Sequence, residues 1–164
     1  MCLLIIDYDK FITRILAILQ NDKEFAKLIN SFRAGDMPDI TSADYFPLCY
    51  VTTAATPVVE RRSIHPSGDI DIIPQEKVIL EFWVRIVTTT DIDQTSMQAE
   101  LHDISSMAEA IFSRHQRLDL NGEDPLCVSS RVHLQGRMEQ FRGQLKEAMT
   151  IRIRPVIYLD YDAS

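Results

Sequence analysis

The stretch EKVILEFWVRIV, residues 76–87, decides which class of fold this chain adopts. Its even-numbered positions from 78 to 86 are all apolar, a period of two that predicts a strand with one buried face. The other face mixes apolar side chains with Glu81, Trp83 and Arg85. A strand that buries one face is expected to be polar on the other. Trp83, the single tryptophan of the chain, therefore raises the question of what covers this second face.

Three other segments have the composition of strands. Residues 48–53 (LCYVTT) are rich in side chains that favour strands. Residues 126–134 and 147–159 alternate between apolar and polar positions, which predicts two more half-buried strands. Pro155 interrupts the last of these segments, and a proline inside a strand favours an edge position or a bulge.

Two helices are expected near the N-terminus. Apolar residues recur at helical spacing over residues 11–19, with Asp7 or Asp9 placed to cap the first turn. A second set of apolar residues at helical spacing predicts a helix that starts near Phe25 and continues to Ala34. Both helices would present an apolar face to the sheet.

A longer helix is expected after Thr95, which forms a capping-box pattern with Gln98. Residues 97–112 then keep apolar positions on one side of the helix. The order α-α-β-β-α-β-β predicts one α+β domain over residues 1–164. We expect a four-stranded antiparallel sheet, covered on one face by this helix and the N-terminal helices, with a long loop at about 54–75.

The charge of the chain and the length of its apolar runs argue against nucleic acid and membranes as partners. The formal net charge is -7, with a pI near 5.0. Proteins that bind nucleic acid on their own are usually basic, because neutralising phosphate supplies most of their affinity. No run approaches the roughly 18–20 apolar residues of a membrane span. The composition predicts a soluble protein made in a cytosol, with no membrane partner.

No pattern in the chain indicates an enzyme or a bound cofactor. The motifs HExxH and GxSxG are absent, and the five glycines are too scattered for a phosphate loop. The strongest alternative is His65, Asp69 and Asp71, whose imidazole and carboxylates could bind a divalent metal ion. The same residue types are also common in loops. A metal-dependent enzyme is therefore a less favoured alternative, and no catalytic, cofactor or metal site is predicted.

The second face of the central strand is the better functional candidate. If it shares a sheet with residues 147–159, its exposed face combines aromatic, arginine and carboxylate groups, a mixture enriched in protein–protein contacts. This face could be covered by the same chain, by a partner subunit or by a ligand. The predicted interface residues are Glu81, Trp83, Arg85, Arg152, Arg154 and Tyr158.

A second candidate contact is the pair Arg61 and Arg62, inside the predicted loop. The pair is either a solvated loop tip or a contact to an acidic neighbour, such as a second subunit or a phosphate backbone. A ring of identical subunits needs two different patches on each chain. The arginine pair is predicted to belong to one patch and the Trp83 face to the other.

Five segments carry a resemblance to a known family. Their order and pattern are similar to those of the tail-terminator, or tail-completion, proteins of long-tailed phages and related viruses. This chain departs from many members in its greater length and in an extended region at 36–75. The segments are FITRILAILQND (11–22), FPLCYVTTAATPVVE (46–60), KVILEFWVRIVTTT (77–90), MQAELHDISSMAEAIF (97–112) and TIRIRPVIYLDY (150–161).

The resemblance implies a structural protein of the virion, made in the host cytoplasm and placed at the tail–neck junction. Six copies would form a ring that caps the tail tube and joins it to the neck connector of the head. Tail-tube protein and connector protein would be the partners, and DNA would pass through the lumen without specific binding. No residue carries over as catalytic. The alternative is a small cytosolic module that binds one protein partner through the Trp83 face.

Overall fold

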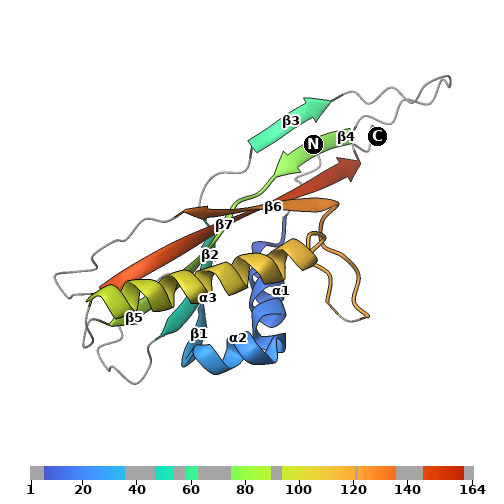
Figure 1. Ribbon diagram of the computed structural model, residues 1–164. Coiled ribbons are helices and arrows are strands. Elements are labelled where there is room, and N and C mark those ends of the chain that lie inside the picture. The colour runs from blue at the N-terminus through green and yellow to red at the C-terminus, as the bar shows by residue number, and fades with distance from the viewer. Residues whose placement is uncertain are drawn as a thin grey trace, which may run out of the picture.

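Three helices and seven strands make up the part of the chain that the computed structural model describes (Figure 1). That part comprises residues 6–35, 47–53, 58–62, 75–89, 94–120, 122–135 and 146–160. The helices are α1 Tyr8–Asn21, α2 Lys23–Leu28 and α3 Gln94–Arg114. The strands are β1 Ser31–Ala34, β2 Leu48–Thr53, β3 Val58–Arg62, β4 Gln75–Ile79, β5 Phe82–Thr89, β6 Ser129–Gln135 and β7 Lys146–Asp160.

The seven strands form one mixed sheet. Hydrogen-bonded neighbours follow the order β1-β2-β5-β7-β4-β3, and β6 pairs with β7 outside this path. β1 and β2 are parallel, whereas the other pairs are antiparallel. The predicted four-stranded antiparallel sheet is therefore wrong, because β1, β3 and β4 enlarge the sheet and β1 joins it in parallel.

β1 occupies residues that were expected to continue the second helix. Helix α2 ends at Leu28, and Ile29 already has extended backbone angles. The strand then pairs with β2, and hydrogen bonds from Asn30 N to Pro47 O and from Gly35 N to Val51 O flank the pair. Sheet hydrogen bonds thus overrode the helical spacing of the apolar residues.

Two aromatic residues that the sequence placed on one helix lie on different elements and still contact one another. The rings of Phe25 and Phe32 lie 6.3 Å apart with an interplanar angle of 51°. Phe25 is fully buried on α2, and Phe32 is partly buried on β1. The helical conformation predicted for Phe32 is therefore wrong, because the residue belongs to β1.

Strands β4 and β5 lie along the same edge of β7 and are separated at Leu80 and Glu81. Leu80 lies opposite Pro155 and donates a 2.9 Å hydrogen bond to its carbonyl oxygen. Proline has no N–H, so it cannot return the second bond of this antiparallel pair. β6 pairs along the opposite edge of β7, so Pro155 lies in a central strand and the predicted edge position is wrong.

The hydrophobic core lies between the sheet and the three helices. Phe82, Val84 and Ile86 of β5 are fully buried in one cluster with α1, α2 and α3. Figure 1 shows all three helices on this side of the sheet, while β3, β4 and the end of β7 project beyond them. The even-numbered positions of the central strand therefore face the core, as their alternation indicates.

Aspartate side chains cap the first turns of α1 and α2. Asp7 caps α1, and its side chain accepts a 3.1 Å hydrogen bond from Lys10 N. Asp22 caps α2 in the same way, through a 3.0 Å bond from Phe25 N. Helix α3 begins at Gln94, so Thr95 lies inside its first turn and the predicted capping position is wrong.

Candidate interaction surface

The candidate surface is the side of the sheet opposite the helices, which we call the outer sheet face. Strand register places its residues in rows, because directly opposite residues point to the same side. One row runs across four strands in the order Thr52, Trp83, Arg152 and His133. The sheet thus brings Trp83 and Arg152 together as neighbours, as expected from their alternation.

Glu81 is the single carboxylate among the described side chains of this region, and two arginines bind it. Arg152 donates from Nε to Glu81 Oε1 at 2.9 Å, and its Nη2 group also contacts that oxygen. Arg154 Nε lies 3.7 Å from the same oxygen. The Glu81 side chain is 12% exposed, whereas those of Arg152 and Arg154 are 37% and 38% exposed. One mostly buried negative charge is therefore shared by two half-exposed positive charges.

The aromatic residues of the outer sheet face differ in exposure. Trp83 is half-buried, so it is neither sealed within its protomer nor fully exposed. Its Nε1 atom is buried without a hydrogen-bond partner among the described residues. Arg85 stacks over the buried ring of Tyr50, with Cζ 5.9 Å from the ring centroid. Tyr158, farther along β7, is 39% exposed.

Strand β6 contributes two residues that the sequence did not assign to this surface. Arg131 lies directly opposite Arg154, and His133 lies directly opposite Arg152. Both β6 residues are exposed. Their alternation placed them on a polar strand face, but only the pairing of β6 with β7 brings them to this surface. Arginine therefore outnumbers carboxylate among the described side chains of this face, on a chain whose net charge is -7.

The remaining predicted site residues lie elsewhere. Arg61 and Arg62 belong to β3, where their backbone pairs with Glu76 and Gln75. The predicted loop at 54–75 therefore contains a strand. Residues 54–57 and 63–74 lie outside the described residues, and these include His65, Asp69 and Asp71. The described part of the chain holds no group of three or more His, Cys, Asp or Glu residues arranged to bind a metal ion.

Replacing Glu81 with glutamine is expected to lower the free energy of unfolding by about 1 kcal/mol. The amide keeps the shape but loses the charge that both arginines share, and the arginines then repel one another. Thermal unfolding should show a smaller loss at 1 M salt, because salt screens the exposed arginines. A loss that is equal at low and high salt would contradict this electrostatic explanation.

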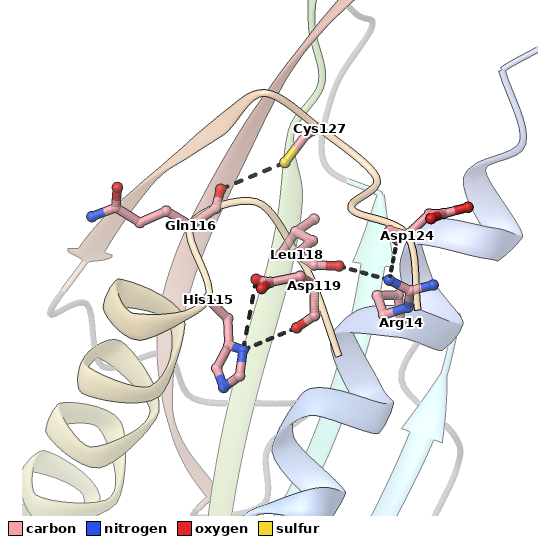
Figure 2. A network of polar contacts seen from close by, with 7 residues as sticks. All are labelled: Arg14, His115, Gln116, Leu118, Asp119, Asp124 and Cys127. Atoms are coloured by element: carbon pink, nitrogen blue, oxygen red, sulfur yellow. Dashed lines mark hydrogen bonds and ion pairs between the residues drawn. The ribbon is translucent and has the colours of Figure 1, made fainter. Parts of the chain in front are cut away.

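A second polar cluster surrounds Arg14 of helix α1 (Figure 2). The guanidinium is buried, and Nη1 donates to the carbonyl oxygens of Leu118 at 2.8 Å and Asp124 at 2.9 Å. Nη2 lies 2.7 Å from Glu123 Oε2. The arginine thus ties helix α1 to the connection between α3 and β6. Since its donors are used on backbone groups of this chain, we assign it a structural role.

The same connection contains a strained residue. Leu118 has φ +49°, a backbone conformation that residues other than glycine rarely adopt. Its side chain is nevertheless fully buried. Its N–H donates to His115 O at 2.9 Å, while its own carbonyl accepts from Arg14. His115 Nδ1 lies 2.9 Å from Asp119 O (Figure 2). These contacts hold the turn that returns the chain to β6.

The thiols of Cys49 and Cys127 are buried, and burial raises the pKa of each to about 12. A thiol that stays protonated is a poor nucleophile and a poor metal ligand. Cys127 Sγ also lies 3.5 Å from Gln116 O (Figure 2). Both residues therefore contribute packing, and neither is a catalytic candidate.

Cys49 is expected to make the folded chain less stable as the pH rises above 9. The unfolded thiol ionises near its ordinary pKa of 9.0, whereas the folded thiol keeps its proton up to about 12. The unfolded state then binds fewer protons, so the free energy of unfolding falls by up to about 1.4 kcal/mol per pH unit. Urea titrations between pH 8 and 11 should show a shallower decline in Cys49→Ala. Equal slopes in the two proteins would contradict the burial of this thiol.

None of the helices in the described ranges is long and apolar enough to cross a membrane. A scan against models of protein families finds no match to this chain, and a search of curated proteins finds no similar sequence.

Proposed function

We propose that this chain is a structural subunit that associates head to tail into a closed ring, as the tail-terminator proteins it resembles do. The observation that carries the proposal is the outer sheet face. It presents a half-buried tryptophan among several arginines, on the side of the sheet opposite all three helices. Tryptophan and arginine are the residues most enriched at the energetic centres of protein interfaces.

The open edges of the sheet support self-association. β6 pairs only with β7 among the described strands, and β1 and β3 form the opposite edge. Exposed strand edges readily pair with further chains unless they are protected. The two edges differ in sequence and direction, so a contact between them would be heterologous. Such contacts form rings when the rotation between subunits closes.

The projecting part of the sheet supports contact with a second kind of subunit. β3, β4 and the last residues of β7 extend past the helices (Figure 1). In a ring, this extension would reach above or below the subunit body. We propose that it contacts the tail-tube protein or the neck connector, which are the partners implied by the resemblance, while DNA passes through the ring without specific binding.

Native mass measurement tests the proposal. Purified protein, alone and mixed with tail-tube protein, is examined by native mass spectrometry and light scattering over a range of concentrations. We expect a closed particle of constant copy number, six if the resemblance holds. A chain that stays monomeric under both conditions would refute the proposal, and a one-to-one complex would favour the single-partner binding module.

Trp83→Ala is expected to weaken assembly more than it weakens the fold. A tryptophan at the centre of an interface is worth about 2 kcal/mol or more, a 30-fold change in association. Tyr158→Ala, farther along β7, is the matched aromatic control and should have a smaller effect. Sedimentation velocity would measure both, with circular dichroism to establish that the variants fold. Equal assembly of Trp83→Ala and the unmodified chain would exclude Trp83 from the contact.

A further inference from the structure

The open edge of β6 has unpaired backbone groups. Pro155 of β7 directs its carbonyl oxygen to Leu80, on the side of β7 away from β6, and Ser130 lies opposite Pro155 on β6. Because backbone groups alternate in direction along a strand, Ser130 and Val132 direct their N–H and C=O groups away from β7. No described strand pairs with them there. An added strand is the partner that satisfies a row of such groups.

A polar hollow lies along this edge. It is lined by residues 129–133 of β6 and by Ser113 and Gln116 near the C-terminal end of α3. Ser130 is 7% exposed, and its Oγ atom has no hydrogen-bond partner in the described part of the chain. Arg131 is exposed, and it makes no ion pair with a described side chain. The edge can therefore receive a strand that brings a hydrogen-bond donor and a negative charge.

Strand β3, at the opposite edge of the sheet, has the matching direction. It is antiparallel to β4, and β4 and β6 are both antiparallel to β7, so β3 and β6 run in opposite directions. The copies in a ring share one orientation, so β6 of one copy and β3 of the next would pair antiparallel. Leu80 bonds to β7, so by alternation Ile79 bonds to Val58 of β3. The backbone groups of Val59 and Arg61 then point to the open edge.

The two edges also join with the same face toward the helices. Val78, opposite Val59, belongs to the hydrophobic core, and so does Ile153, opposite Val132. The residues whose backbone groups point outward on each edge therefore occupy helix-side positions on both strands. An antiparallel ladder between these edges would continue the sheet from one copy into the next without reversing its faces.

One register of this ladder pairs residues of complementary chemistry at three successive positions. The pairs are Val59 with Val132, Glu60 with Arg131, and Arg61 with Ser130. Opposite charges at directly opposite positions stabilise a sheet by about 0.2–1 kcal/mol. Glu60 would lie between Lys77 of its own chain and Arg131 of the next copy. Arg61 would bring donors to Ser130, beside the C-terminal end of α3, which favours positive charge.

The other strand at that edge, β1, fits β6 less well. Phe32 belongs to the helix side of the sheet. In the registers that pair both Phe32 and Ala34 with β6, Arg33 lies opposite Arg131 or His133, which destabilises the pair. Helix α1 contacts β1 and α3 contacts β6 on the same side of the sheet, so two helices would compete for one space. β3 and β4 project past the helices (Figure 1).

We infer that the open edge of β6 pairs antiparallel with β3 of the next copy, with Glu60 opposite Arg131. The inference rests on the proposed ring and names the two strands that join its subunits. The row that contains Trp83 would then continue from His133 into Val58 of the next copy. Since the pairing uses only the edge of β3, the faces of the projecting sheet remain for a second kind of subunit.

Proline at an outward-directed position tests the pairing. Val132→Pro removes one N–H from the open edge of β6 and leaves the bonds to β7, and Arg61→Pro does the same on β3. Each variant should fold, as circular dichroism would show, and should lose assembly at least about 10-fold in sedimentation velocity. An equimolar mixture should form a one-to-one heterodimer and nothing larger, because Val132→Pro keeps an intact β3 edge and Arg61→Pro keeps an intact β6 edge.

A charge exchange tests the register. Arg131→Glu or Glu60→Lys alone places like charges opposite one another and should weaken assembly at least about 5-fold. A chain that carries both substitutions should recover it. Arg131 lies opposite Arg154 in its own protomer, so Arg131→Glu should not destabilise the fold. Arg33→Glu, an exposed position on β1, is the matched control and should assemble normally.

The outcomes separate the inference from the proposed function. If the unmodified chain assembles and either proline variant still assembles alone, the inference is overturned while the ring remains. If Arg33→Glu strengthens assembly and Glu60→Lys has no effect, β1 is the partner strand and the inference is overturned. A dimer that Val132→Pro abolishes and Arg61→Pro leaves intact would mean that β6 pairs with β6. If the unmodified chain never assembles, the proposed function fails, and the inference fails with it.

Discussion

Replacing Phe82 with alanine is expected to lower the free energy of unfolding by about 4 kcal/mol, which corresponds to a fall in Tm of roughly 8–16 °C. Phe82 is fully buried at the start of β5. Its ring stacks on Phe11 of α1 with centroids 5.5 Å apart, and it lies 6.1 Å from the ring of Tyr8. Removing it leaves a cavity where the first helix meets the central strand. Urea unfolding followed by circular dichroism would measure the loss.

The neighbouring residue provides a contrast on the opposite face of the same strand. Trp83→Ala removes a larger ring from a half-buried position, and we expect a loss in the isolated chain of less than half that of Phe82→Ala. Phe82→Leu serves as a conservative control and should cost about 1–2 kcal/mol. If Trp83→Ala destabilised the isolated chain more than Phe82→Ala, the tryptophan would belong to the core and not to an interaction surface.

Arg14→Met is expected to cost about 3 kcal/mol, although it places an apolar side chain of similar length in the same space. The carbonyl oxygens of Leu118 and Asp124 each lose a charged donor, and unsatisfied buried groups are costly. The loss should appear in hydrogen exchange as faster opening of the α3–β6 connection. A uniform acceleration over the whole chain, with no excess at residues 115–127, would contradict this local role.

The ion pair of Arg14 allows a matched control. Glu123 contacts the same guanidinium, but its side chain is 58% exposed, so solvent screens its charge. Glu123→Gln should therefore change the free energy of unfolding by less than about 1 kcal/mol. A larger effect from Glu123→Gln than from Arg14→Met would mean that the ion pair, and not the backbone hydrogen bonds, holds the connection.

The outer sheet face and the core differ in what stabilises them. The core side of β5 is apolar at Phe82, Val84 and Ile86, and all three are fully buried within one chain. The outer side combines an arginine–glutamate cluster, opposed positive charges and a half-buried indole, none of which maximises the stability of an isolated protomer. Groups that are not optimal for folding are a common feature of functional surfaces. The subunit contact proposed for the outer sheet face would cover the indole and offset the opposed charges.

Predictions from local pattern succeeded where the signal was short in range. β2 has the predicted bounds, Asp7 caps the first helix as one of the two alternatives expected, and even-numbered positions of the central strand are buried. The alternation at 126–134 was less reliable. Val128 was expected on the apolar side but is 57% exposed, because β6 begins only at Ser129.

The local sequence pattern was enough to predict the central strand and its buried side. It also predicted that the other side combines charged and aromatic residues. Hydrophobic period and capping depend on residues a few positions apart, so the chain displays them before it folds. Local sequence pattern did not predict three features of the sheet. β1 joins it in parallel, Pro155 lies in a central strand, and Arg131 lies beside Arg154. Each depends on which distant strand supplies the hydrogen bonds, and that choice is made by the packing of the whole sheet.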